Sequence, residues 1–315
     1  MDHTSLNPEI GNAYDFDAYV ACLQEHGMGQ ILDIVPNHMG VGGDDNLWWL
    51  DVLEHGEASV YAPYFDIDWH PVNPILHNKV LLPFLGDHYG KVLEQGELKL
   101  VFDARHGTFH VRYFEHLFPI DPRTYPRILV FRPELLEQRL ASQHDVLAEF
   151  RALIAVCQAL PRRTELSGEM RQQRRHGAAD CKRELARFCL HSPALCDFLQ
   201  ENVALFNGTP GEAASFDQLH DLLEEQAYRL AYWQVATDEI NYRRFFDINE
   251  LAGIRMDSDE VFTVTHRIIQ KDIEFKELGL LIIDEEQRFG VTPVSYTHLR
   301  AHETVLDLVC RLLLE

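Results

Sequence analysis

The stretch Gln30–Val41, QILDIVPNHMGV, decides how this chain is interpreted, because it joins a buried-strand pattern to polar residues. Its first residues are apolar apart from Asp33, as in a strand buried on both faces of a parallel sheet. Pro36 cannot donate to a strand ladder, so we expect the strand to stop there. Asn37 and His38 then follow its carboxyl end, which in a βα barrel carries the chemistry. Alternatively, Asp33 is a buried aspartate that forms ordinary structural hydrogen bonds, and the histidine after it has no role in catalysis or binding.

A helix is predicted immediately before this strand. Asp15 or Asp17 near its start suits the helix dipole, and Gly27 is a natural C-cap. Its apolar residues recur at helical spacing and are Phe16, Tyr19, Val20 and Leu23. A helix, a short loop and a strand make one αβ step of a barrel-type fold.

Composition and charge limit the partners of this chain. The 315 residues are 46% hydrophobic, enough for a sizeable core, and carry a formal net charge of −22. Such an acidic surface disfavours nucleic acid and anionic membranes, whereas a neutral substrate is compatible with it. The first residues show no signal-peptide pattern, and no apolar run approaches the roughly 20 residues that span a bilayer.

The six cysteines are sparse, and none forms a C-x-x-C pair. Neither a zinc site of that type nor a secreted disulfide framework is therefore predicted. We expect reduced thiols in a cytoplasmic protein. These cysteines are Cys22, Cys157, Cys181, Cys189, Cys196 and Cys310.

A basic run occupies residues 162–183 and includes Arg171, Arg174, Arg175, Lys182 and Arg183. A nucleic-acid-binding patch is one interpretation of this run. A solvated helix face is favoured instead, because the whole chain is acidic and no aromatic residues are interleaved with the basic ones.

The residues 33–38, DIVPNH, match the D-x-x-x-N-H signature of the α-amylase superfamily, glycoside hydrolase family 13. The chain more closely resembles maltooligosyl trehalose synthases, which are (1→4)-α-D-glucan 1-α-D-glucosylmutases, over residues 2–270. Three further segments carry the likeness: DHTSLNPEIG at 2–11, WWLDVLEHGEASVYAPYFDIDW at 48–69 and EINYRRFFDINELAGIRM at 239–256. The resemblance implies an α/β fold, a partial (β/α)8 barrel fragment with a large, mostly helical inserted domain.

This resemblance also suggests a division of the chain. Within the insertion, strand-forming residues alternate over 98–102 and 108–114 and predict a hairpin, whereas residues 133–235 keep a helical period, including Leu219, Leu222, Leu223 and Leu230. The expected parts are a barrel fragment (1–39), an inserted domain with an aromatic and β part before its helical part (40–235), a return to the barrel (236–270) and a foreign tail (271–315).

The resemblance implies a maltooligosaccharide or glucan substrate and a set of residues that contact it. His38 would hydrogen-bond the sugar at the cleavage subsite, and Asn37 and Asp33 would shape that loop. Trp48 and Trp49 could stack on sugar rings, although filling a small core is the alternative for most aromatics of residues 48–69. The remaining candidates lie in an extended segment, YRRFF at 242–246, and are Tyr242, Arg243 and Arg244.

The two arginines of that segment have a structural alternative as well. Either could form an internal ion pair with Asp247 or Glu250 instead of bonding sugar hydroxyls.

No catalytic residue is assigned, and neither a metal nor a cofactor is expected. Retaining glycoside chemistry needs a nucleophilic carboxylate and an acid/base carboxylate. Asp257 lies in an R-x-D pattern that resembles the family's nucleophile strand, but it or Ser258 is a good N-cap, with Glu260 completing a capping box. The segments that carry the family's nucleophile and general acid are not found in these 315 residues. We therefore expect this polypeptide to be an inactive fragment of a trehalose-biosynthesis isomerase.

The last part of the chain has a different sequence pattern. In residues 271–291, the apolar run 280–283 precedes Asp284-Glu285-Glu286-Gln287, a DExx-type box that resembles motif II of transcription-repair coupling factors. Because no G-x-x-x-x-G-K-[ST] loop is present, this box receives no function. Residues 292–315 match neither family and look like an assembly artefact, so a chimera is our hypothesis.

Other classes of function remain open. One is a non-catalytic glucan-binding fragment, for which the aromatic residues of 48–69 speak, and another is a different α-amylase-family glycosidase. A nucleotide-driven DNA protein is supported only by residues 284–287. The missing phosphate loop and the acidic charge argue against it.

Overall fold

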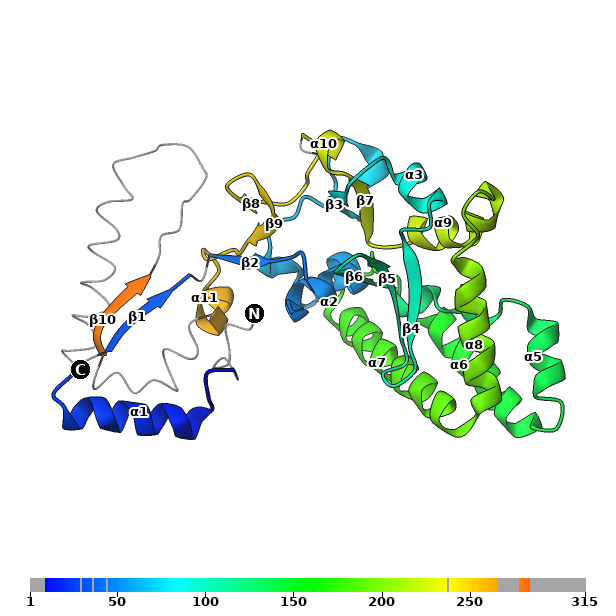
Figure 1. The fold of residues 1–315 in the computed structure, drawn as a ribbon, viewed down its shortest axis with the longest axis horizontal. Coiled ribbons are helices and arrows are strands. Elements are labelled where there is room, and N and C mark those ends of the chain that lie inside the picture. Colours follow the sequence, from blue (N-terminus) through cyan, green and yellow to red (C-terminus); the bar gives the residue numbers. More distant parts are fainter. Residues whose placement is uncertain are drawn as a thin grey trace. The chain divides into compact units, whose positions relative to one another are not determined.

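The computed structural model describes residues 9–28, 30–35, 37–43, 45–236, 238–265 and 278–283. The chain divides into two compact units. Unit 1 comprises 1–40, 64–66 and 244–315, and unit 2 comprises 41–63 and 67–243. Figure 1 labels the elements of both, and the predicted domain boundaries after residues 39, 235 and 270 stay predictions.

Unit 1 begins with helix α1 (Ala13–Glu25), which confirms the helix predicted before the strand. The Asn12 side chain accepts hydrogen bonds from the backbone N–H groups of Tyr14 and Asp15, at 2.9 and 3.2 Å. Asp15 Oδ2 in turn accepts from Asn12 N at 3.0 Å, which completes a capping box. Gly27 has a φ of +65° just after the helix, the conformation expected of a C-terminal glycine.

The predicted strand is present as β1 (Gln30–Ile34), and it pairs in parallel with β10 (Leu278–Ile283). The strand predicted at residues 280–283 is thereby confirmed too, whereas Pro36 and the box at residues 284–287 lie outside the described residues. Within the described part of the chain, every sheet has two or three strands. The structure is thus a mixture of helices and small sheets, and it does not confirm a partial barrel.

A second sheet of unit 1 joins segments that are far apart in the sequence. Its antiparallel order is β2 (His38–Gly40), β9 (Ile248–Gly253) and β8 (Arg244–Phe245). Helix α11 (Asp259–Thr265) follows. Phe262 N donates to Ser258 O at 2.9 Å, which places Ser258, one of the two predicted candidates, at the N-cap, whereas the Asp257–Glu260 capping box stays a prediction.

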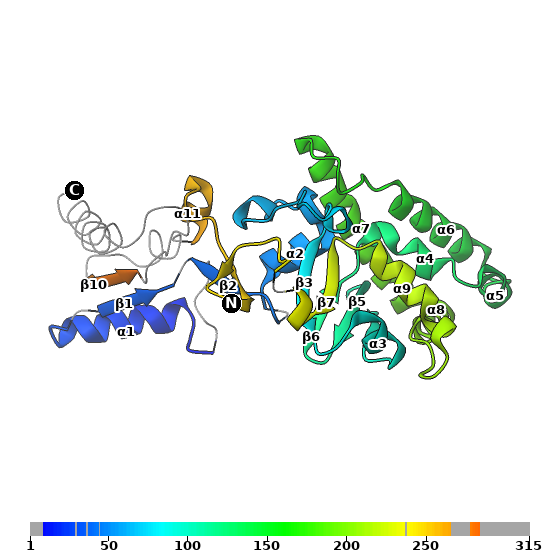
Figure 2. The ribbon, with the colours of Figure 1, turned by 90° about the horizontal axis from the view of Figure 1, so that it is seen from above.

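Two small sheets form the β part of unit 2. β3 (Val80–Leu85) and β7 (Tyr228–Tyr232) are parallel and lie side by side in Figure 2. β4 (Lys99–Asp103), β5 (Thr108–Tyr113) and β6 (His116–Pro119) form an antiparallel meander. The predicted hairpin is confirmed, and β6 is an additional strand. The helical assignment of Leu230 is wrong, because this residue belongs to β7.

The helical part of unit 2 follows the predicted period from residue 133 to residue 224. Its longest helices are α6 (His144–Ala159), α7 (Gly168–His191) and α8 (Pro193–Phe206), which pack in that order (Figure 1). The Phe150 and Phe188 rings meet edge-to-face between α6 and α7, with centroids 5.7 Å apart. The shorter helices are α2 (Leu47–His55), α3 (Tyr89–Glu94), α4 (Pro126–Leu129), α5 (Pro133–Arg139), α9 (Asp217–Glu224) and α10 (Trp233–Ala236).

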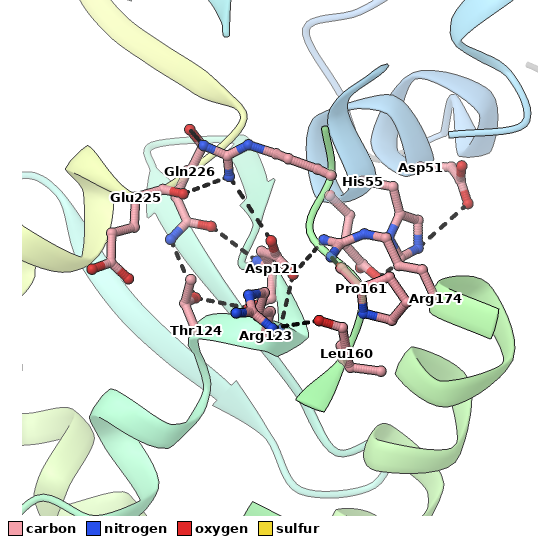
Figure 3. A network of polar contacts seen from close by, with 12 residues as sticks. Asp51, His55, Asp121, Arg123, Thr124, Leu160, Pro161, Arg174, Glu225 and Gln226 are labelled. Carbon is pink, nitrogen blue, oxygen red and sulfur yellow. Dashed lines mark hydrogen bonds and ion pairs between the residues drawn. The ribbon is translucent and has the colours of Figure 1, made fainter. Parts of the chain in front are cut away.

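A buried polar network ties α7 to the rest of unit 2 (Figure 3). Arg174 on α7 is only 1% exposed, and its Nη2 lies 2.6 Å from Asp121 Oδ1. Arg174 Nη1 also donates to the Pro161 carbonyl oxygen at 2.5 Å, and Arg163 Nη1 lies 3.8 Å from Asp121 Oδ2. Lys182 donates to both carboxylate oxygens of Glu54 at 2.6 Å. The expected solvated face is therefore wrong at Arg174 and Lys182, which bind internal carboxylates.

Candidate functional site

Asn37 and His38 follow the carboxyl end of β1, and His38 begins β2. Asn37 is buried, and its carbonyl oxygen accepts a hydrogen bond from Ile254 N at 2.8 Å. His38 Nδ1 lies 2.7 Å from the Asn37 side-chain oxygen, and the His38 ring stacks on Phe245 with centroids 3.9 Å apart. Because that oxygen only accepts, the proton of this contact resides on Nδ1.

The role of Asp33 stays a prediction. Its backbone lies in β1 opposite Ile282 of β10, but its side chain is outside the described part of the chain. The loop residue Asn37 is instead fixed by the backbone of the segment that follows β9.

Arg244 is already engaged within unit 1. Its side chain, 14% exposed, has Nη1 donating to Asn249 Oδ1 at 2.6 Å. Arg244 Nη2 lies 3.5 Å from Asp247 Oδ1, which is the internal ion pair named as the alternative. Because Asp247 is exposed, this pair is a weak one. Arg243 is half-buried and belongs to unit 2.

Trp48 and Trp49 lie inside unit 2. Trp49 is 1% exposed and meets Tyr242 edge-to-face at 5.2 Å, and Tyr242 is itself buried. Trp48 is 8% exposed and stacks on Tyr61 at 5.8 Å. A ring with so little exposed surface has no free face for a sugar, so the structure favours the small-core alternative for both tryptophans.

An exposed aromatic cluster in unit 2 was missed by the sequence interpretation. Trp233 is 49% exposed, and its ring lies 6.2 Å from that of Tyr232 in an edge arrangement. The Tyr232 ring is 5.2 Å from His88. These residues follow or end the parallel strands β3 and β7, so they gather at one edge of that sheet. The alternation Tyr228, Leu230, Tyr232 was the available signal, had it been assigned to a strand.

Asp257 is engaged at the start of α11. It is exposed, lies 3.8 Å from Arg255 Nη2, and precedes α11. Glu260 in the first turn of α11 accepts a hydrogen bond from the Tyr64 hydroxyl at 3.2 Å. The ion pair with Arg255 is the contact that holds Asp257 at the start of the helix.

The described residues also hold no group of three or more histidine, cysteine, aspartate or glutamate side chains placed to bind one metal ion. Among the described helices, none combines the length and the apolarity that crossing a membrane requires.

Comparison with known proteins identifies relatives of most of the chain. No family model matches it. The putative maltooligosyl trehalose synthase of Mycobacterium tuberculosis (strain CDC 1551) is 26% identical over 300 residues, which cover 90% of this chain and 35% of that protein. The maltooligosyltrehalose synthase structure from Arthrobacter ramosus matches 90% of this chain and 24% of its own, with 26% identity and a TM-score of 0.52.

A second relative matches a much smaller part. The transcription-repair-coupling factor of Bacillus subtilis (strain 168) is 48% identical over 69 residues, covering 21% of this chain and 6% of that protein. The chain thus spans 35% of the length of its synthase relatives. Over 90% of its residues the chain is similar in sequence and in fold to maltooligosyl trehalose synthases, and short segments are similar to transcription-repair coupling factors.

Proposed function

We propose that this chain contributes glucan-contacting residues to an enzyme of trehalose biosynthesis. The parent reaction would convert the reducing-end α-1,4 linkage of a maltooligosaccharide into an α,α-1,1 linkage, giving maltooligosyl trehalose. The arrangement of His38, held by Asn37 and stacked on Phe245 after β1, carries this proposal. The parent fold would be a (β/α)8 barrel with a mostly helical insertion, in a cytoplasmic isomerase of the α-amylase superfamily.

His38 is the residue best suited to contact a sugar. Asn37 orients the imidazole through Nδ1, and an imidazole nitrogen can hydrogen-bond a sugar hydroxyl. Phe245 fixes the plane of the ring from one face. In unit 2, the half-exposed face of Trp233 offers an apolar surface of the kind on which a pyranose ring stacks.

We also propose that these 315 residues do not catalyse the rearrangement by themselves. The reaction requires a carboxylate nucleophile and a carboxylic acid close to each other. The one R-x-D aspartate that resembles the nucleophile, Asp257, pairs with Arg255 at the start of α11. Incubation of the purified chain with maltoheptaose should yield no maltooligosyl trehalose, and formation of that product would refute this part.

Titration calorimetry of the purified chain with maltoheptaose tests the glucan contact directly. Binding should be measurable, should be absent with cellohexaose, and should weaken several-fold in His38→Ala. His26→Ala, which removes an exposed imidazole from unit 1, is the matched control and should bind as the unsubstituted chain does. Equal affinities of His38→Ala and His26→Ala, or no binding by the unsubstituted chain, would overturn the proposal.

The similarity to transcription-repair coupling factors supports a second candidate, a DNA-dependent ATPase. This candidate is the weaker one, because the 315 residues contain no phosphate-binding loop. A phosphate-release assay with ATP and duplex DNA should give no activity above background. The chimera hypothesis predicts that amplification of the source DNA across the codons for Gln270 and Lys271 fails to give a continuous product.

A further inference from the structure

The turn between β8 and β9 holds a phenylalanine in a backbone conformation that favours glycine or asparagine (Figure 1). Phe245 pairs with Ile248, so Phe246 and Asp247 form a two-residue hairpin loop. Phe246 has a φ of +52° and is 50% exposed. Loops of this length with a positive φ usually carry asparagine, aspartate or glycine, because a larger side chain is strained in the left-handed region. Phe246 therefore keeps a strained backbone without the full burial that usually offsets such a cost.

Phe246 ends a short row of rings that begins at His38. The Phe245 ring stacks on His38, with centroids 3.9 Å apart and an interplanar angle of 20°. Phe246 meets Phe245 edge-to-face, with centroids 4.5 Å apart and an interplanar angle of 77°. His38 begins β2 and Phe245 ends β8, and both strands pair with β9. One small sheet of unit 1 thus brings an exposed apolar ring close to the imidazole that Asn37 orients.

A polar group follows this ring in the same turn. The Asp247 side chain is 99% exposed, and its Oδ1 lies 3.5 Å from Arg244 Nη2 in a weak ion pair. A carboxylate accepts hydrogen bonds from hydroxyl groups, and an aromatic face covers apolar surface. A pyranose ring presents both hydroxyl groups and an apolar C–H face, so its chemistry matches this turn.

We infer that Phe246 is a sugar-stacking residue, which packs against the apolar face of a glucose unit in the glucan that His38 contacts. This inference rests on the proposed function and adds a position to it. The hairpin fixes the direction of the ring before the sugar arrives, so binding loses little side-chain freedom. The strain at Phe246 is then the cost of holding an aromatic ring, rather than a small polar residue, at the tip of the turn.

The β5–β6 hairpin provides a matched control. Tyr113 pairs with His116, so Phe114 and Glu115 form the same kind of two-residue loop in unit 2. Phe114 has a φ of +49°, is 67% exposed and meets Tyr113 edge-to-face at 4.7 Å. Phe114 and Phe246 therefore share their residue type, turn conformation and exposure. They differ in that the Phe246 ring adjoins Phe245, which stacks on His38.

Titration calorimetry of the full chain with maltoheptaose tests this role. Phe246→Asn keeps the turn, because asparagine adopts the left-handed conformation readily, and should weaken binding roughly three- to tenfold, as expected for one aromatic contact. Phe246→Trp keeps an aromatic face and should bind within about twofold of the unsubstituted chain. Phe114→Asn should bind as the unsubstituted chain does. Thermal unfolding followed by circular dichroism should give Phe246→Asn a midpoint no lower than that of the unsubstituted chain.

The outcomes distinguish this inference from the proposed function. If the unsubstituted chain binds no maltoheptaose, or if His38→Ala binds it equally tightly, both fail. If His38→Ala weakens binding and Phe246→Asn does not, only the role of Phe246 is refuted. Equal losses in Phe246→Asn and Phe114→Asn would refute it too, because they would reflect a general effect of removing an exposed ring. A lowered unfolding midpoint in Phe246→Asn together with weak binding by Phe246→Trp would assign the ring a structural role and overturn the inference.

Discussion

The ion pair between Arg174 and Asp121 makes a quantitative test of how unit 2 is held together. The substitution Arg174→Met replaces the charged side chain by an unbranched apolar one. Both partners are buried, Arg174 at 1% and Asp121 at 2% exposure, and their closest atoms are 2.6 Å apart. The substitution therefore leaves a buried carboxylate without its nearest cation.

The size of the effect follows from the contacts that are lost and those that remain. Removing one partner of a buried ion pair costs about 3–5 kcal/mol. The carbonyl oxygen of Pro161 also loses its donor at 2.5 Å, a further cost of about 1 kcal/mol. Arg163 at 3.8 Å and the backbone N–H of Arg123 at 2.9 Å still support the carboxylate. We therefore expect a net loss near the lower end, about 3 kcal/mol.

Denaturant unfolding followed by tryptophan fluorescence measures this loss. Arg175→Met is the matched control, because Arg175 lies next to Arg174 on α7 but is exposed, and its loss should change stability by less than about 0.5 kcal/mol. The double variant Arg174→Met/Asp121→Asn should cost less than the sum of the two single variants, because the carboxylate no longer needs a partner. Equal midpoints and slopes for Arg174→Met and Arg175→Met would refute this account of the network.

Two further outcomes are expected for unit 2. Burial lowers the pKa of His55 from 6.5 to about 4, so protonation of this imidazole favours the unfolded chain. The free energy of unfolding should therefore fall by about 3 kcal/mol as the pH drops from 6.5 to about 4. His55→Gln should flatten that part of a pH series of urea midpoints, and an unchanged pH dependence in this variant would contradict the assignment. Gly107 has a φ of +65°, and a Cβ there would lie 2.0 Å from Lys182 O, so Gly107→Ala should lower stability by more than about 2 kcal/mol. Gly211→Ala, with a φ of +95° and open space, should cost about 1 kcal/mol, and similar melting temperatures for both would contradict the packing.

The elements that the sequence predicted correctly are those set by local pattern. The helix before β1, the strand itself and the β4–β5 hairpin each follow from a short run of residues with one period. Leu230 was assigned wrongly because it continues the helical spacing of Leu219 and Leu223. Its strand is instead fixed by parallel pairing with β3, where Leu82 is the register partner of Leu230. The local spacing of apolar residues does not reveal a strand partner that is distant in the sequence.

The buried network could not be predicted for a related reason. A run of arginines and lysines on a helix indicates solvent exposure unless the partners are known. Arg174 is buried because Asp121, from a different part of the chain, meets it at 2.6 Å. Lys182 is paired with Glu54 in the same way. The sequence shows that these residues are basic, but which of them are buried depends on carboxylates that the fold brings next to them.

The contacts of His38 join two segments that are distant in the sequence and that both resemble the synthases. His38 pairs with Gly253 in the β2–β9 ladder and stacks on Phe245, so residues 38–40 and 244–253 lie in one small sheet. This meeting is itself a structural reason for those residues, independent of any sugar. What the sheet does not require is the hydrogen bond between the Asn37 side chain and His38 Nδ1, which orients the imidazole. The functional interpretation of this site therefore rests on the imidazole rather than on the segments that position it.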